Sequence, residues 1–146
     1  DIRREGDDAG VTSAAVQPRV DTPARISKGL KELVGHAERA EGEVREALVE
    51  KGYEKLRGLC EAIVEQDLFK GVVQRYAPNI MMTKLEKVNV SELPGSMSDI
   101  AGVFDKACRY IASHSQPIET QGIRPTLEEL RQDHETVCKA WEAHRT

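Results

Sequence analysis

Aromatic residues are scarce in this sequence, which holds two phenylalanines, three tyrosines and one tryptophan among 146 residues. Hydrophobic residues still make up 39% of the chain. A chain of this length hides roughly 68–70% of its unfolded surface when it folds as one domain. We therefore expect a hydrophobic core that consists mainly of leucine, valine, isoleucine and alanine.

The chain also lacks an excess of basic residues, because its 21 lysines and arginines face 25 aspartates and glutamates, a formal net charge of −4. Basic and acidic residues balance over residues 22–118, and acidic residues are in slight excess over residues 1–21 and 119–146. A surface that follows a nucleic-acid backbone needs its cations gathered on one face. Nucleic acid is therefore not the partner that we expect.

No apolar run approaches the roughly 18 or more residues of a membrane span, and no charged and then apolar leader opens the chain. The cysteines are odd in number, widely spaced and set in helical apolar patterns, which is typical of buried reduced thiols: Cys60, Cys108 and Cys138. We expect an intracellular protein, cytoplasmic or nuclear, with no membrane partner. Since the chain begins at Asp1, it can be a fragment of something longer.

Residues 1–21 contain scattered small and charged residues without an apolar period. Such a composition is typical of a disordered tail or linker. A short linear motif that orders on binding is the alternative interpretation of this segment.

Residues 22–51 have the pattern of one long helix. Thr22 offers a capping hydroxyl, and Pro23 follows at the first helical position, where a missing amide hydrogen costs least. Apolar residues then recur at alternating spacings of four and three from Ile26 to Ala47, which predicts a stripe that packs on another helix. Gly52 is the candidate residue for the end of this helix.

The broadest apolar face of the chain lies in residues 53–76. A face of that width needs neighbours on more than one side, so we predict that this segment is the central helix, or helix pair, of the domain. Gly58 and Gly71 interrupt it, and Asp67 could cap a second helix. The sequence leaves both arrangements open.

Three further helices are predicted. The first is short, residues 80–88, with Asn79 as its cap. The second covers residues 96–112, capped by Ser96 after a turn at residues 93–95. The third begins with the capping box of Thr126 and Glu129. The predicted fold class is thus all-α: a single bundle of about four to six helices over residues 22–146, with a disordered N-terminal tail.

Signatures of catalysis and of nucleotide or metal binding are missing, and the chain contains neither GxGxxG nor GxxxxGK. His134 and Cys138 share one face of the last helix, but no CxxC or second histidine pair completes a tetrahedral zinc site. Thiols on apolar stripes are more often inert than nucleophilic. We predict a protein that is not an enzyme and has no cofactor and no metal site.

Several residues are candidates for a partner-binding surface. The predicted short helix carries adjacent methionines, which adapt readily to a partner, although methionine in a helix is more often core. The only tryptophan lies near the end of the last helix, where it either plugs the core or anchors a partner, and we favour the plug. The candidates are Met81, Met82, Leu85, Val137 and Trp141.

These patterns favour an α-helical protein–protein interaction module that docks a partner's helix or linear motif. Self-association through the stripe from Ile26 to Ala47 is one version of this hypothesis and would give a homo-oligomer. The alternative is a nucleic-acid-associated regulatory domain that uses helices 80–88 and 96–112. That alternative requires four cationic side chains to converge: Lys84, Lys87, Lys106 and Arg109.

Overall fold

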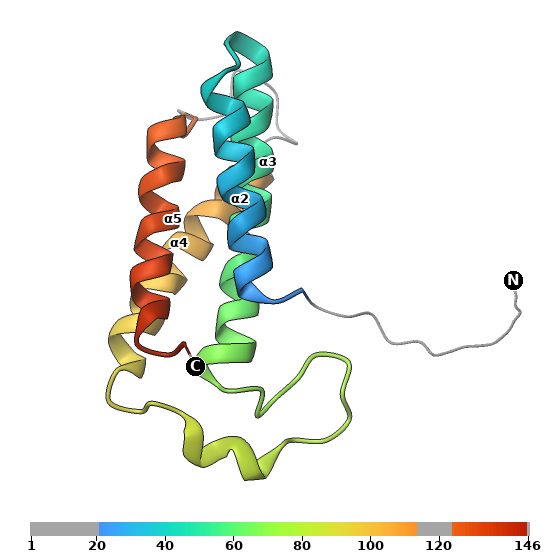
Figure 1. Cartoon of the computed structure of the whole chain (residues 1–146), viewed down its shortest axis with the longest axis vertical. Coiled ribbons are helices and arrows are strands. Elements are labelled where there is room, and N and C mark those ends of the chain that lie inside the picture. Colours follow the sequence, from blue (N-terminus) through green and yellow to red (C-terminus); the bar gives the residue numbers. More distant parts are fainter. Residues whose placement is uncertain (1–20, 114–123, 146) are drawn as a thin grey trace, which may run out of the picture.

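The computed structural model describes residues 21–113 and 124–145 (Figure 1). Every regular element in these two ranges is a helix, which confirms the predicted all-α fold. The elements are α2 (Pro23–Glu38), α3 (Gly42–Ile63), the π-helical turn η1 (Val64–Leu68), the 3-10 helix η2 (Met82–Lys87), α4 (Leu93–Ser113) and α5 (Leu127–Glu142). The predicted tail, apart from Asp21, and most of the loop before Thr126 lie outside the described residues.

Residues 22–51 form two helices and not the single helix predicted. The N-cap prediction is confirmed, because the Thr22 hydroxyl accepts a hydrogen bond from the Arg25 amide at 3.3 Å. The chain then reverses after α2, and α3 returns beside it (Figure 1). Gly42 has a φ of 58°, a left-handed conformation that favours glycine. Arg45 donates hydrogen bonds to the carbonyls of Ala37 and Glu38, both at 3.0 Å, and so satisfies the exposed end of α2.

Gly52 does not end a helix but lies buried inside α3. A Cβ atom at this position would lie 2.5 Å from Cδ2 of Leu130 and 3.3 Å from Cδ2 of Leu33. Glycine is therefore needed here because the side chains of α2 and α5 press directly against the α3 backbone.

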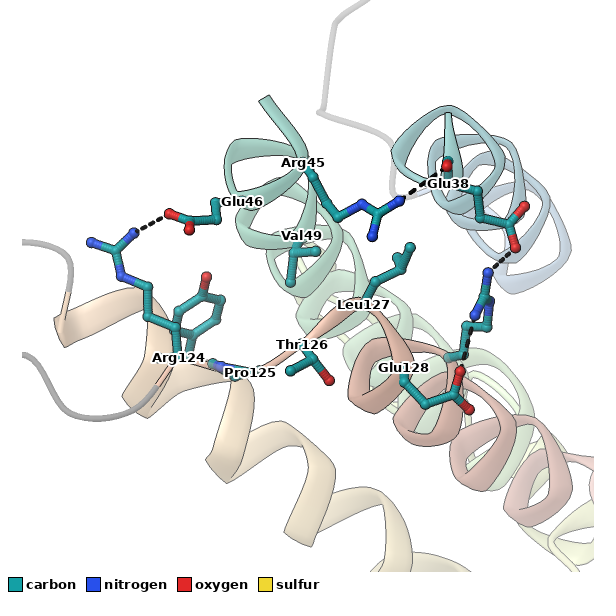
Figure 2. Close-up of a pocket in the computed structure, with 11 residues that line it drawn as sticks. Glu38, Arg45, Glu46, Val49, Arg124, Pro125, Thr126, Leu127 and Glu128 are labelled. Atoms are coloured by element: carbon teal, nitrogen blue, oxygen red, sulfur yellow. Dashed lines mark hydrogen bonds and ion pairs between the residues drawn. The ribbon is translucent and has the colours of Figure 1, made fainter. Parts of the chain in front are cut away.

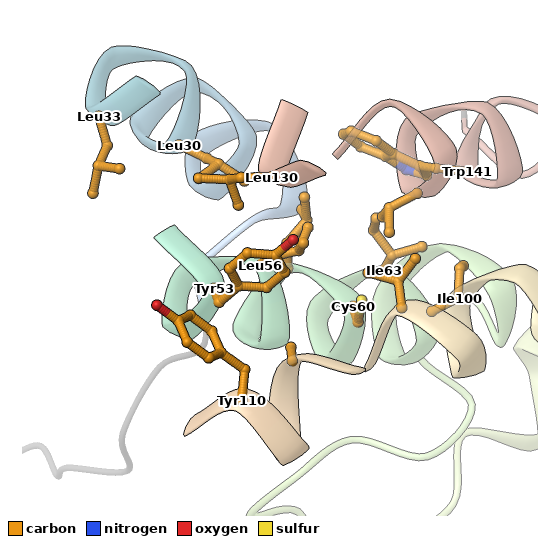
Figure 3. Packing of buried hydrophobic residues seen from close by; sticks show 14 of the residues in the cluster. Leu30, Leu33, Tyr53, Leu56, Cys60, Ile63, Ile100, Tyr110, Leu130 and Trp141 are labelled. Carbon is orange, nitrogen blue, oxygen red and sulfur yellow. The ribbon is translucent and has the colours of Figure 1, made fainter. Parts of the chain in front are cut away.

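Helix α3 is the centre of the bundle and contacts α2, α4 and α5. Its inward hydrophobic residues are at most 3% exposed, and Tyr53, Leu56 and Ile63 are completely buried (Figure 3). The ring of Tyr53 meets that of Tyr110 on α4 edge to face, with centroids 5.3 Å apart. The predicted central position of this segment is confirmed for its helical part.

The segment 53–76 contains one helix followed by turns, which answers the question that the sequence left open. After Ile63 the backbone widens into η1, where the Phe69 amide donates to the Val64 carbonyl at 3.0 Å. Asp67 caps no second helix, because its carboxylate accepts a hydrogen bond from the Trp141 indole. Beyond η1, Val73 and Tyr76 are 61% and 57% exposed and lie outside the core.

The next two predicted helices differ from the structure at their starts. The short one is η2, a 3-10 helix without a side-chain cap from Asn79. Helix α4 begins at Leu93, three residues before the predicted cap, because Pro94 is tolerated in a first helical turn. Ser96 is not a cap: it is buried, and its hydroxyl is 2.9 Å from Nε2 of His144.

The last helix starts as predicted. Thr126 Oγ1 accepts from the Glu129 amide at 3.1 Å, and Glu129 Oε1 accepts from the Thr126 amide at 3.2 Å. This reciprocal pair is the predicted capping box. None of the described helices is long and apolar enough to cross a membrane.

Candidate docking groove

An apolar groove of about 680 Å³ opens between the end of α3 and the first half of α4. Helix α3 and η1 supply one side, α4 supplies the other, and the turns after η1 close one end. Its lining is Cys60, Glu61, Val64, Glu65, Phe69, Val73, Arg75, Met97, Ile100, Ala101 and Phe104.

On the α4 side of this groove, a small residue separates two large ones. Met97 and Phe104 are seven residues apart, a span of about 10 Å along a helix. Ala101 is exposed between them and leaves room for a larger side chain. Ile100 lies deeper and is only 2% exposed, so it forms part of the floor. The groove can therefore receive a bulky apolar group from outside.

The segment that closes the groove has an unusual backbone. It begins with η1, and π-helical turns occur frequently at functional sites. Lys70 and Tyr76 adopt positive φ angles of 53° and 68°. For residues other than glycine such conformations cost about 1–3 kcal/mol each and persist only where surrounding contacts impose them. This wall is thus held in shape by its neighbours.

Charged residues occupy only the rim of the groove. Nε of Arg75 lies 2.9 Å from Oε1 of Glu65, and an Arg75 terminal nitrogen lies 3.7 Å from Oε1 of Glu61. One guanidinium thus faces two carboxylates. The rim keeps one negative charge in excess, which favours a cationic group on any ligand that covers it.

Large exposed hydrophobic side chains are concentrated in one part of the described chain, and two of them, Val73 and Met97, line the groove. Of those in the described chain, all except Val44 lie between residues 73 and 97: Val73, Tyr76, Ile80, Met81, Met82, Leu85, Val90 and Met97. The Met81 amide donates to the Val72 carbonyl at 2.7 Å, so Met81 lies next to the groove wall. Where such side chains form one contiguous patch, they are typical of an interaction site.

The structure separates the predicted partner-binding residues into two sets. Met81, Met82 and Leu85 are 39%, 63% and 52% exposed. Val137 and Trp141 belong to the core instead, at 0% and 4% exposed, because α5 turns this face toward α3. The five residues therefore do not form one surface, and the expectation that Trp141 plugs the core is the correct one.

A second cavity of about 770 Å³ lies at the other end of the bundle (Figure 2). Its arginines already bind partners within the chain: Arg124 binds Glu46 at 3.2 Å, and Arg131 binds Glu128 at 3.0 Å and also Glu38. The Arg131–Glu38 pair ties α5 to α2, and the Arg124–Glu46 pair ties the segment before α5 to α3.

A polar cluster crosses the core between α3, α4 and α5. The Tyr53 hydroxyl donates to Asp133 at 2.6 Å, and Lys106 binds Asp133 at 2.8 Å and Glu129 at 3.1 Å. Burial and the bond to Asp133 raise the pKa of Tyr53. Partial burial lowers the pKa of Lys106, but its carboxylate partners outweigh this, so the net pKa is raised.

The same contacts bear on the nucleic-acid alternative. Lys106 faces carboxylates of α5, and Arg109 pairs with Asp105 at 3.1 Å. Two of the four cations that this alternative needs are thus engaged within the chain.

The residues considered for metal binding and thiol chemistry take part in packing. His134 Nε2 lies 2.8 Å from the Ser27 hydroxyl, which is 3.9 Å from the Cys138 sulfur. Within the described residues no cluster of three potential metal ligands forms. Burial raises the pKa of the Cys60 thiol to about 12, which disfavours the reactive thiolate.

Comparison with protein-family models, with curated proteins and with solved structures found no match for this chain. The groove is therefore interpreted from its own geometry. The sequence predicted that a partner helix docks on this chain, but none of its five candidate residues lines the groove. The broad apolar face of residues 53–76 indicated a need for neighbours on more than one side, but not which helices form the groove.

Proposed function

We propose that this chain is a non-enzymatic interaction module whose groove docks an amphipathic helix of another protein. The observation that carries the proposal is the apolar groove between α3 and α4, with exposed apolar side chains on the adjoining loop. Amphipathic helices bind such grooves through apolar residues spaced i, i+3 or i+4, and i+7.

The dimensions support a helix as the occupant. The α4 side extends over about 10 Å between Met97 and Phe104, which is close to two turns of a bound helix. The small side chain of Ala101 leaves space for the central side chain of the partner helix, for which we propose leucine or phenylalanine. Met81, Met82 and Leu85 are exposed on the adjoining loop, where their side chains can extend the contact beyond the groove.

The charge of the rim specifies the partner further. Glu61 and Glu65 share the single cation of Arg75. A lysine or arginine on the flank of the partner helix compensates the remaining carboxylate charge. The free thiols Cys60, Cys108 and Cys138 suit a reducing compartment, so we place this interaction inside the cell.

Self-association through the first predicted stripe is not part of the proposal. Leu30, Leu33 and Ala37 of that stripe are at most 7% exposed, because they pack against the chain's own helices. A second copy would have to displace α2 before it could bind them.

A displayed library of amphipathic helical peptides of about 16 residues tests the docking proposal. The chain is immobilised, enriched peptides are synthesised, and their affinities are measured by fluorescence anisotropy. We expect binders with an apolar stripe and at least one cationic flank. Ala101→Arg should weaken their binding by at least about tenfold, since it places a long charged side chain in the apolar groove lining.

Ser98→Arg is the matched control, because Ser98 is exposed on the same helix but does not line the groove. It adds the same charge and should leave the affinity unchanged. Failure to enrich any helical peptide, or equal affinity of the two arginine variants, overturns the proposal. Sedimentation velocity on the free chain tests whether a second copy of the chain occupies the groove instead. A dimer that Ala101→Arg dissociates would assign the groove to a second copy.

A further inference from the structure

The end of α5 and the turn after it bind the segment that carries the groove wall. Four hydrogen bonds connect residues 141–144 to positions between Asp67 and Ser96. These contacts join parts of the chain that are distant in sequence and lie close together at one end of the bundle. We call residues 141–145 the C-terminal clasp.

Two of these contacts hold η1 and the strained turn. The Trp141 indole donates to the Asp67 carboxylate, and the Lys70 ammonium donates to the His144 carbonyl. Trp141 is 4% exposed, and the Arg145 guanidinium lies 4.0 Å from the centre of its ring. The positive φ of Lys70 is therefore stabilised by a contact with the clasp.

The other two contacts hold the far end of the loop. The Asn89 side chain donates to the Ala143 carbonyl at 3.3 Å, and Nε2 of His144 lies 2.9 Å from the Ser96 hydroxyl. His144 is 1% exposed, and its Nδ1 is buried without a partner in the described chain. A buried nitrogen without a partner is unfavourable, so it weakens the attachment of this turn.

We infer that the C-terminal clasp sets the shape of the groove, so that helix docking and the attachment of residues 141–145 are energetically coupled. This inference rests on the proposed function and assigns its regulation. When the clasp detaches, Lys70 loses its carbonyl partner and η1 loses the indole contact, and the wall that carries Phe69 and Val73 relaxes. Because coupling is reciprocal, a bound helix stabilises the attached state by the same free energy by which attachment strengthens helix binding.

Amide hydrogen exchange on the free chain tests the clasp without any peptide. The reporters are the hydrogen-bonded amides of Gly71, Val72 and Met81. In Trp141→Phe, which keeps an aromatic ring but removes the indole donor, we expect these amides to exchange about tenfold faster, with the amides of α2 unchanged. Asn89→Ala removes an exposed hydrogen bond, so the bundle should stay folded. It should also make the Met81 amide exchange faster.

Arg131→Gln is the control, since it breaks ion pairs at the opposite end of the same helix. It should leave the three reporter amides unchanged. The inference is overturned if the reporters do not respond to either clasp variant, or if α2 amides accelerate by the same factor, which would indicate a loss of global stability.

The coupling between the clasp and docking is measured in a separate experiment, as the affinity of a peptide selected against the unmodified chain. We expect Trp141→Phe to weaken that peptide several-fold while Arg131→Gln does not. Unchanged affinity in the presence of faster exchange refutes the coupling. If no peptide is obtained, the proposed function fails, and the exchange data still decide whether the clasp holds the wall.

Discussion

His134 shows how a single side chain can make this fold sensitive to pH. Its ring is buried between α2 and α5, and its Nε2 meets the Ser27 hydroxyl at 2.8 Å. Burial, and secondarily the positive charge of Lys31, lower the pKa of His134 below its ordinary value of 6.5. The folded state therefore binds a proton less readily at this position than the unfolded state does.

The sign of the effect follows from proton linkage. Stability from this residue is fully present above the ordinary pKa of 6.5, and it is lost as the pH falls from there toward the lowered folded-state pKa. We predict that the free energy of unfolding decreases between about pH 7.5 and pH 5.5 and that His134→Gln reduces this decrease. Urea denaturation at both pH values, followed by circular dichroism, measures it.

The comparison isolates His134, because the other histidines are common to both proteins. Glutamine retains a side-chain amide that can bond Ser27 but does not titrate. If the free energy of unfolding fell equally between the two pH values in the unmodified chain and in His134→Gln, the prediction would be contradicted.

Two glycines of α3 make opposite contributions to that helix. Gly52 lies against Leu130, where a Cβ atom would approach to 2.5 Å, whereas a Cβ at Gly58 would meet nothing within 4 Å. Both positions lie inside α3, so both gain helix propensity when glycine becomes alanine, by up to about 1 kcal/mol. Only at Gly52 does overpacking oppose that gain, at a cost of about 1–3 kcal/mol.

We therefore predict that Gly58→Ala stabilises the protein by about 0.5–1 kcal/mol and that Gly52→Ala destabilises it by up to about 2 kcal/mol. Chemical denaturation of the two variants beside the unmodified chain gives both values. Stabilisation by Gly52→Ala would show that Leu130 can move aside and that the close approach of α5 to α3 is loose.

Hydrophobic periodicity located the helices but not the joints between them. The stripe from Ile26 to Ala47 continues through the reversal at residues 39–41, since each half keeps its own spacing. The joint depends on the left-handed conformation of Gly42 and on Arg45, which binds the end of α2. Neither feature changes the apolar pattern, so sequence periodicity predicted one helix where two exist.

The local signals were more reliable at helix starts with side-chain caps. Thr22 and the Thr126–Glu129 box are in place, because these hydrogen bonds form between neighbours in sequence. Ser96 has the same pattern but is used differently, since its hydroxyl bonds His144, 48 residues away. A partner so distant in sequence cannot be read from the residues around Ser96.

At the scale of the whole molecule, an apolar stripe has the same spacing whether it faces a helix of its own chain or a groove. Ile100 and Phe104 are on one stripe of α4, yet Ile100 is 2% exposed and Phe104 is half-buried in the groove lining. Exposure of Met81 and Leu85 likewise depends on where the loop lies, and burial of Val137 and Trp141 on how α5 is turned. The candidate site could therefore be located only in the folded bundle and not in the sequence.

Cys60 reports on the integrity of that assembled bundle, because it lies at the floor of the groove and is 1% exposed. Cys108 and Cys138 are half-buried. Since burial raises the pKa of Cys60 to about 12, its thiolate is rare at neutral pH, and we expect a labelling reagent to reach it only when the bundle opens.

We predict that in a chain with Cys108→Ala and Cys138→Ala, the remaining Cys60 reacts with a disulfide reagent at least about 100-fold more slowly than Cys108 does in the corresponding single-cysteine chain. Urea below the unfolding midpoint should raise the logarithm of the Cys60 labelling rate in proportion to the fall in unfolding free energy, since whole-bundle opening exposes it. A rate for Cys60 that equals that of Cys108 and is independent of urea would show that the groove floor opens locally. In that case the α3–α4 contact is a mobile joint, and a docking helix would have to order it before binding, at a cost in affinity.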